Sequence, residues 1–420
     1  MKSRIVIWGA GKQGRDAYYH LNRRYDIEGF LDSDITKTGI EVVDHKKVLA
    51  DQGQRFFIVI ACQKWMEVSN VLLNRGLKFL NDFIPYNMLI KKHICLHNLI
   101  DCFDISDIIE YLSRIKETKK LALIYGNCQT EIIANMLEYN VEFNRQYVLL
   151  RVPQIHLYRN EEQIEQIFYK SNIMQKMDLF IYQRVNENNR FHSMLGTENI
   201  LKQFNNNIKS LAIHNIYFDG YFPQYDANDE RYFRNLNKKD FPYTDGIVDL
   251  MIKEKKSSDE IVTLISSEDL LSEKEVKEKC EQSISNLRER EKVVDVPIVD
   301  YIEENYCNEQ LFYTYNHPKN IVIYEYVKRL LKCLGIEKND EFTEEELNIE
   351  FGTLRINNFP IFPCVIKALG LKKYEKKVRI SHISTNLITI EDYIREYIYR
   401  CYGVIESRGT NGQEYFNNRS

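Results

Sequence analysis

The sequence predicts an α/β protein with two domains. Short apolar runs alternate with amphipathic helical patterns over about the first ninety residues, and the same strand, turn and helix pattern begins again near residue 121. A chain of 420 residues is also long for one hydrophobic core. We therefore expect a domain at residues 1–95, a helical linker at 96–118, a larger α/β domain with a helical C-terminal part at 119–405, and a flexible tail at 406–420.

The elements of both sheets follow from the periodicity of the apolar residues. In the first domain we expect strands at 4–8, 27–31 and 56–61 and helices at 12–24 and 65–75. In the second domain, strands are expected at 121–125, 147–152, 179–183 and 211–214. Capping signals then predict three helix starts, at Ser272 with Glu275, Thr343 with Glu346, and Thr389 with Asp392.

Composition excludes several classes of protein. Hydrophobic residues make up 44% and charged residues 28%, the balance of a globular protein. The 57 basic and 61 acidic residues give a net charge of −4, so no nucleic-acid partner is expected. The nine cysteines include no Cys-x-x-Cys pair, so we expect no disulfide framework and no metal.

The chain is expected to be cytoplasmic. Its longest apolar run, residues 56–62, is far shorter than the roughly 20 residues of a membrane-spanning helix. The N-terminus reaches the strand at 4–8 almost at once, without the apolar region and cleavage site of a signal peptide.

A glycine-rich turn follows the first expected strand. Gly9, Gly11 and Gly14 fit G-x-G-x-x-G between a strand and a helix, where a phosphate can approach the N–H groups of the helix N-terminus. Asp32 ends the second strand, where a carboxylate can accept hydrogen bonds from a ribose. The motif predicts a Rossmann-like nucleotide-binding unit; the alternative is that the glycines only permit close packing of strand and helix.

The segment Gly29-Phe30-Leu31-Asp32-Ser33-Asp34 adds a resemblance. With the glycine motif, it is similar to the N-terminal nucleotide-sugar-binding domains of some bacterial sugar acyltransferases. The resemblance covers about ninety residues. It implies a UDP-sugar-like ligand in preference to NAD.

A second turn carries a candidate nucleophile. Cys128 lies in Gly126-Asn127-Cys128-Gln129, between an expected strand and an expected helix. The helix dipole and unpaired N–H groups there are expected to lower the thiol pKa, and the N–H groups of Cys128 and Gln129 can hold an oxyanion. His317, in Asn316-His317-Pro318, is a candidate base. The alternatives are an inert buried cysteine and a structural histidine.

Four ordered motifs then carry a family resemblance: Gly126-Asn127-Cys128-Gln129, residues 178–183, residues 218–223 and residues 311–318. Together they resemble the WcbI-type polysaccharide biosynthesis proteins, regarded as acetyltransferases, over about residues 119–370. The resemblance implies acyl transfer from a coenzyme A thioester such as acetyl-CoA to a sugar hydroxyl of a capsular or surface polysaccharide.

By the same analogy the turn is similar to the nucleophile turn of S-G-N-H hydrolases, with Cys128 in the place of their serine and His317 as the base. Thr314 stands where those esterases place an aspartate, so the orienting group is open between Asn316 and a backbone carbonyl. Gln183 is an oxyanion donor, a sugar ligand or a strand cap. The wider candidate set for the oxyanion or the substrate is Gly126, Asn127, Gln129, Gln183 and Asn316.

Two mechanisms and two rival functions stay open at this point. Cys128 carries the acyl group covalently, or His317 activates the sugar directly while Cys128 shapes the pocket. The rivals are an NAD-dependent sugar oxidoreductase or epimerase and a non-catalytic nucleotide-sugar-binding protein. Peripheral association with polysaccharide assembly machinery is a further expectation, and the sequence leaves open the sugar, the acyl group and the oligomeric state.

Overall fold

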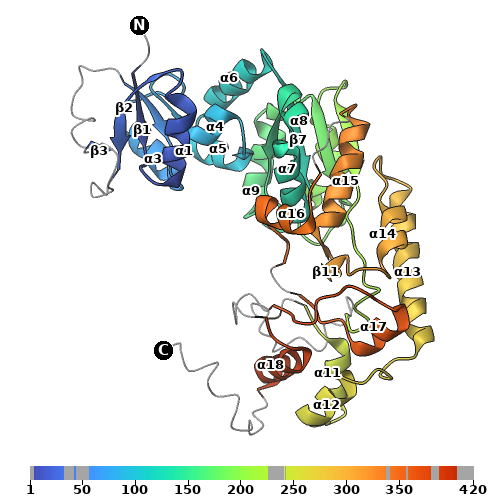
Figure 1. The fold of residues 1–420 in the computed structure, drawn as a ribbon. Helices are drawn as coiled ribbons and strands as arrows, with labels where there is room; N and C mark the ends of the chain where they lie inside the picture. Colours follow the sequence, from blue (N-terminus) through green and yellow to red (C-terminus); the bar gives the residue numbers. More distant parts are fainter. Residues whose placement is uncertain are drawn as a thin grey trace. The chain divides into compact units, whose positions relative to one another are not determined.

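The computed structural model describes residues 4–32, 42–43, 56–225, 241, 243–336, 341–355, 358–379 and 387–403. These form an α/β protein with two parallel sheets, as the sequence predicts. The chain divides into two compact units, residues 1–213 and 214–420 (Figure 1). Ser33, Asp34 and the tail expected at 406–420 lie outside the described residues.

The first sheet lies at the start of the first unit. Its five parallel strands are ordered β3-β2-β1-β4-β5, and buried apolar side chains fill β1 and β4. The order changes direction beside β1, so the turn after β1 lies where open α/β sheets bind ligands. The elements are β1 (Arg4–Trp8), α1 (Lys12–Leu21), β2 (Asp26–Leu31), β3 (Val42–Val43), β4 (Phe57–Ile60), α3 (Trp65–Leu73), β5 (Phe83–Pro85) and α4 (Tyr86–Ile90).

The segment expected to be a linker is packed into the first unit. Strand β6 (Ile94–Cys95) joins the second sheet by pairing with β8. It is followed by α5 (Leu96–Cys102) and α6 (Ile105–Lys116), where the buried Tyr111 hydroxyl donates to the carbonyl of Met88 over 2.7 Å. The division between the units therefore falls at residues 213 and 214 and not in this segment.

The second sheet is also fully parallel, in the order β10-β9-β7-β8-β6. Every residue of β8 and β9 is buried, as expected for strands covered on both faces. Strand β8 lies beside β7 on one side of the sheet, and β9 and β10 lie on the other side. The strand order therefore reverses between β7 and β9. The elements are β7 (Lys120–Tyr125), α7 (Gln129–Tyr139), α8 (Val141–Gln146), β8 (Tyr147–Arg151), α9 (Glu161–Ile164), η1 (Glu165–Lys170), η2 (Ile173–Lys176), β9 (Leu179–Gln183), η3 (Ser193–Leu195), α10 (Thr197–Leu201) and β10 (Lys209–Ile213).

The second unit is mostly helical around a short antiparallel hairpin. Side-chain caps at Ser272, Thr343 and Thr389 begin α13, α16 and α18, which confirms the three predicted helix starts. Within the described ranges, no helix has the length and apolar content needed to cross a membrane. The elements are α11 (Gly246–Lys253), α12 (Ser258–Ile265), α13 (Glu273–Glu291), α14 (Val299–Asn305), β11 (Phe312–Thr314), β12 (His317–Pro318), α15 (Asn320–Cys333), α16 (Glu344–Phe351), α17 (Pro363–Leu369) and α18 (Ile390–Tyr402).

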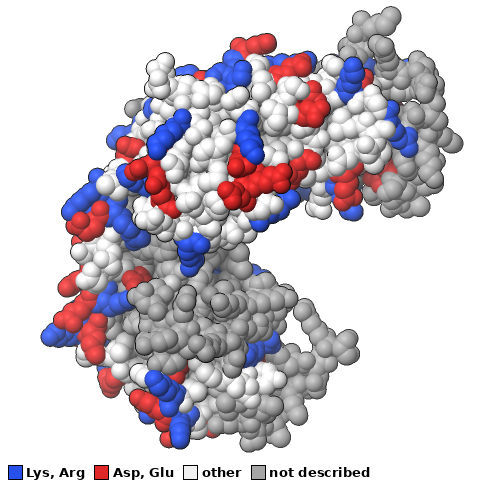
Figure 2. Space-filling model, turned by 180° about the vertical axis from the view of Figure 1, so that it is seen from behind, with Lys and Arg blue, Asp and Glu red and all other residues white. Residues whose placement is uncertain are grey.

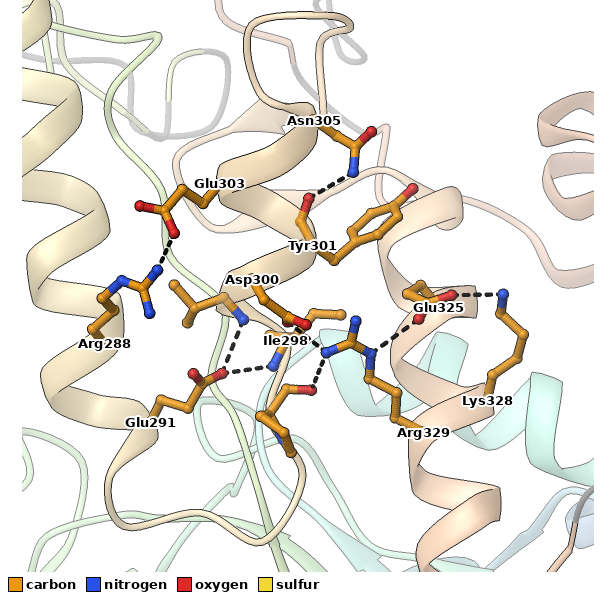
Figure 3. A network of polar contacts seen from close by, with 12 residues as sticks. Arg288, Glu291, Ile298, Asp300, Tyr301, Glu303, Asn305, Glu325, Lys328 and Arg329 are labelled. Atoms are coloured by element: carbon orange, nitrogen blue, oxygen red, sulfur yellow. Dashed lines mark hydrogen bonds and ion pairs between the residues drawn. The ribbon is translucent and has the colours of Figure 1, made fainter.

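A polar network fixes α15, which begins directly after the strand that carries His317 (Figure 3). Arg329 of α15 donates to Asp300 of α14 over 2.5 Å and to the carbonyl of Pro297 over 3.1 Å. Glu291, at the end of α13, accepts from the backbone N–H groups of Ile298 and Val299, at 2.6 and 2.9 Å. The N-terminus of α14 is thus held by a carboxylate, the charge that a helix N-terminus favours.

Two buried carboxyl groups join α11 to α18. Asp245 is fully buried, and one of its oxygens accepts from the N–H of Val248 over 3.0 Å. Asp249 accepts from the hydroxyls of Tyr397 and Tyr402, at 2.8 and 2.6 Å. Burial raises the pKa of Asp245 to about 8, and the neighbouring Asp249 adds to this effect although the Val248 N–H opposes it. Asp245 is therefore mostly protonated in the folded protein at neutral pH.

We predict that Asp245→Asn stabilises the protein at pH 8 but much less at pH 5. The unfolded carboxyl ionises near its ordinary pKa of 3.8, whereas the folded group holds its proton to about pH 8, so wild-type stability falls as the pH rises between these values. Asparagine keeps the cap and removes the ionisation. The melting temperature of the variant should exceed that of the wild type by on the order of 5 °C at pH 8. Asp16→Asn, on the exposed side of α1, is the matched control, and parallel profiles for Asp245→Asn and wild type would contradict the prediction.

Candidate functional site

The turn that holds Cys128 is built around a close approach at Gly126. A Cβ atom at this position would lie 2.4 Å from Oε1 of Gln183 and 2.8 Å from Cγ2 of Thr130. Only glycine therefore fits between the end of β7 and the side chain that ends β9. The chain enters α7 at Gln129, so Cys128 occupies the N-cap position, at the helix N-terminus as predicted.

Gln183 fixes the shape of this turn. Its Oε1 accepts from the N–H of Asn127 over 2.8 Å, and its Nε2 donates to Oε1 of Gln129 over 3.2 Å. The N–H of Gln129 in turn donates to Oδ1 of Asn127 over 2.9 Å. Gln129 and Gln183 are each 1% exposed, so these bonds are shielded from water. The structure thus brings four of the predicted residues together, Gly126, Asn127, Gln129 and Gln183, around Cys128.

The pKa of Cys128 is raised to about 11, opposite to the expected direction. Burial of the thiol is the larger effect, and the backbone N–H groups of Cys128 and Gln129 oppose it. The expectation of a lowered thiol pKa is therefore wrong, because the free-energy cost of burying a thiolate exceeds the stabilisation that the helix N-terminus gives it. The two N–H groups do act on the sulfur, as expected of the turn.

We predict that alkylation of Cys128 requires alkaline pH. With a pKa of about 11 in place of 9, the thiolate is about 100-fold scarcer than that of an ordinary thiol at neutral pH. Iodoacetamide labelling, resolved by peptide mass spectrometry, should rise through pH 9 to 11 at Cys128. The exposed Cys333 is the internal reference for reagent access. Labelling of Cys128 that is complete and independent of pH below pH 8 would contradict this result.

The Cys128 turn also lies at the switch point of the second sheet. It follows β7, and Gln183 ends β9, the neighbouring strand on the side where the strand order reverses. The loop after β8 is tied to the same turn, since the N–H of Ile155 donates to the carbonyl of Gly126 over 3.0 Å. Open parallel sheets bind ligands outside the carboxyl ends of their strands at such a point.

A buried ion pair beside this sheet was not predicted from the sequence. Arg151 ends β8, and its guanidinium donates to Glu138 over 2.6 Å and to Glu131 over 2.7 Å. The side chains of Arg151 and Glu138 are only 4% and 3% exposed. His93 contacts the same Glu138 carboxylate over 3.1 Å. The sequence shows only an arginine at the end of an apolar strand. This pattern does not indicate which acidic residues the arginine contacts.

His317 lies in the second unit, in strand β12. It is 9% exposed, and its ring packs edge-on against Tyr243 with centroids 6.1 Å apart. The hydroxyl of Thr314, which stands in the place of the missing aspartate, donates to Oδ1 of Asn316, the candidate for the orienting group, over 2.9 Å. Because Cys128 belongs to the first unit, its pairing with His317 stays a prediction.

Half-buried tyrosines gather near His317, and the sequence analysis missed them. Tyr225 and Tyr315 stack with ring centroids 3.8 Å apart. Tyr243 packs edge-on against Tyr315 at 5.3 Å, and Tyr217 stacks on Tyr315 at 5.5 Å. The four tyrosines are spread over a hundred positions without periodicity, so no sequence pattern indicated that they meet.

Close packing requires two glycines of the first motif, Gly9 and Gly14, whereas Gly11 has space beside its Cα. A Cβ on Gly9 would lie 2.5 Å from the carbonyl oxygen of Ala61, and a Cβ on Gly14 would lie 1.8 Å from that of Gly9. Among the described residues other than its chain neighbours, no atom lies within 4 Å of the position of a Cβ on Gly11, the N-cap residue of α1. Asp32 accepts from the N–H of Ala10 over 2.7 Å. Asp32 therefore contacts the glycine turn, and its role as a ribose ligand stays a prediction.

The rest of the described surface and interior adds no metal-binding site. In the portion of the chain that the structure describes, no group of three or more His, Cys, Asp or Glu side chains has the arrangement of a metal site. Figure 2 shows basic and acidic side chains interspersed over the face it draws. This mixing agrees with the small net charge of −4.

Two parallel sheets, with a cysteine turn at the switch point of the second, define an α/β protein whose candidate site lies at the carboxyl ends of the strands. The chain belongs to the WcbI family of polysaccharide biosynthesis enzymes, because the family model matches residues 121–339. No curated protein matches the chain.

A solved structure supports the fold. It aligns with a TM-score of 0.56 and 19% identity, covering 68% of this chain and 91% of the other. That protein is described as WcbI, a novel polysaccharide biosynthesis enzyme, in native form without a disulfide bond between coenzyme A and one of its cysteines. The family assignment confirms the predicted resemblance.

Proposed function

We propose that this chain is an acyltransferase that moves an acyl group, most simply acetyl, from a coenzyme A thioester to a sugar hydroxyl of a capsular or surface polysaccharide precursor. The observation that carries the proposal is the Cys128 turn, a thiol at a helix N-terminus within the family region. The related WcbI structure, described with reference to coenzyme A and a cysteine, supports a coenzyme A donor here. The proposed setting is the cytoplasm.

The turn supplies two parts of the proposed chemistry. In this proposal the N–H of Cys128 holds the oxyanion that forms when the thioester carbonyl is attacked. The N–H of Gln129 joins it by turning from Oδ1 of Asn127, to which it donates in the structure. Gln183 keeps these groups in place by binding Asn127 and Gln129. Gln183 is therefore a positioning residue in this proposal, because both ends of its amide are engaged by the turn.

In the covalent route, His317 takes the proton of Cys128 and the sulfur attacks the thioester carbonyl carbon. The bond from that carbon to the coenzyme A sulfur breaks, and coenzyme A leaves as a thiolate that takes up a proton. The sugar hydroxyl then attacks the acyl-Cys128 thioester and gives its proton to a base as the Cys128 sulfur leaves. A pKa of about 11 makes a base necessary, since the resting thiol is protonated at neutral pH.

In the direct route, His317 takes the proton of the sugar hydroxyl, which attacks the coenzyme A thioester itself. Cys128 then shapes the pocket and forms no bond to the acyl group. Both routes give the same products, an acylated sugar and coenzyme A. Trapping of an intermediate distinguishes them.

We predict that Cys128→Ala and His317→Ala each lower acyl transfer from acetyl-CoA by about 10²-fold or more. In the covalent route, His317→Ala protein incubated with acetyl-CoA also carries an acetyl group on the Cys128 peptide, found by mass spectrometry. Cys333→Ser, at an exposed cysteine, is the matched control and should keep full activity. Full activity of both alanine variants would contradict the acyltransferase site.

We further propose that the N-terminal glycine turn binds a nucleotide or nucleotide-sugar. The open position at Gly11 supports this, because a phosphate needs that space to approach the N–H groups of α1. Asp32, at the end of β2, is the proposed ribose ligand. An oxidoreductase or epimerase using NAD at this turn is the second candidate function, and a nicotinamide absorbance change on turnover would favour it.

We predict that Gly11→Ala leaves folding unchanged but weakens binding of UDP-glucose about tenfold, because the added methyl group occupies the open position and meets none of the described residues beyond its chain neighbours. Gly14→Ala is the contrasting variant, which should lose the fold of the first unit, since its Cβ would overlap the carbonyl of Gly9. Calorimetry with UDP-glucose and with NAD measures affinity. Equal affinity of wild type and Gly11→Ala, or no binding of either ligand by wild type, would overturn the nucleotide site.

A further inference from the structure

The edge of the second sheet opposite the Cys128 turn carries a basic and apolar surface. Because the sheet is parallel, the starts of its strands lie along one edge. Lys119 and Lys120 stand at the start of β7, and Lys91 and Lys92 shortly precede β6. We call these four lysines, with Tyr139 at the end of α7 and Val141 at the start of α8, the basic edge.

The four lysines lack the carboxylate partners that their neighbours have. Among the described residues, no Asp or Glu oxygen lies within 4.0 Å of their ammonium groups. Lys116, a few residues away, is paired with Asp178 at 2.8 Å, and Arg145 with Glu142 at 3.1 Å. The positive charge of the basic edge is thus not neutralised within the described chain.

The ammonium groups are also close enough to affect one another. Burial lowers the pKa of Lys119, and the charges of Lys91 and Lys92 lower it further. The Lys119 ammonium donates to the carbonyl of Asn144, and that of Lys120 lies 5.9 Å from the ring centre of Tyr147. Like charges held together in this way oppose folding unless an anionic partner compensates them.

Two exposed apolar side chains lie beside these charges. Val141 is 65% exposed and Tyr139 is 40% exposed. Asn140, between them, accepts from the N–H of Phe143 over 2.9 Å and so caps α8. The side chain of Asn144, whose carbonyl binds Lys119, donates to the carbonyl of Glu138 and links the lysines to this turn.

We propose that the basic edge docks the protein on an anionic lipid bilayer. Lysine ammonium groups contact the anionic headgroups, and Val141 and Tyr139 insert at the headgroup level, where an aliphatic side chain and a tyrosine are both favoured. A nucleic-acid partner fits less well, because an exposed aliphatic side chain gains nothing from a phosphate backbone. Docking does not depend on the proposed acyl transfer, so a negative result for one proposal does not contradict the other.

Docking at this edge has a consequence for the Cys128 turn. Lys120 begins β7 and the turn follows its other end, so the two are separated by the length of a six-residue strand, about 20 Å. The turn is then held at that distance from the bilayer surface. An acceptor sugar attached to a lipid through a phosphate linkage could reach it from the same membrane.

The test is co-sedimentation of the full chain with vesicles of phosphatidylcholine alone and with 30% phosphatidylglycerol, a composition chosen as roughly that of an anionic membrane. We expect binding only to the anionic vesicles, lost as salt rises. Lys91→Gln, Lys92→Gln and Lys120→Gln combined should weaken it about 100-fold, since each lysine contributes about fivefold. Val141→Ser should weaken it about threefold or more.

The matched control combines Lys274→Gln and Lys277→Gln on α13 with Lys292→Gln at its C-cap, where each lysine is paired with a glutamate. It removes the same charge and should leave vesicle binding within twofold of wild type. Absence of binding, equal binding to both vesicles, or equal losses in the two triple variants would overturn the proposal. Binding to heparin as tight as to vesicles, unaffected by Val141→Ser, would assign the surface to a soluble polyanion instead.

Discussion

The arrangement of the second sheet at the carboxyl ends of its strands depends on one close approach, that of the Gly126 backbone to the side chain of Gln183. Only a glycine allows it, and it places the amide of Gln183 against Asn127 and Gln129. The strands β7 and β9 are thereby joined at their carboxyl ends by a side chain as well as by the ladder. Helix α7 begins at Gln129, directly after this turn, so Cys128 is held at the N-cap position of the helix.

Burial and the helix N-terminus act in opposite directions on Cys128, and burial has the larger effect. The half-buried Cys128 thiol is protonated at neutral pH, so it needs a base before it can attack a carbonyl. The site is therefore incomplete within the turn. In the proposed function the second unit supplies that base through His317, on a hairpin next to the anchored helix α15.

Local features were predictable from the sequence and long-range ones were not. The bounds of β1 and β9 and the capped starts of α13 and α16 match the expectations, because periodicity and capping depend on near neighbours. The role of Gln183 was left open between three alternatives, since its partners lie more than fifty residues away. The Arg151 ion pair and the tyrosines near His317 were not predicted. The spacing of such residues along the sequence does not indicate which residues they contact in the fold.

In the proposed function, the Cys128 sulfur is the atom that meets coenzyme A. Thiol–disulfide exchange with coenzyme A disulfide tests it most directly, because the Cys128 sulfur would take one coenzyme A and release the other as a thiol. Peptide mass spectrometry after incubation at pH 9 should find coenzyme A on Cys128, and an excess of acetyl-CoA should suppress it. Coenzyme A bound mainly to another of the nine cysteines, or to Cys128 without suppression by acetyl-CoA, would contradict the account.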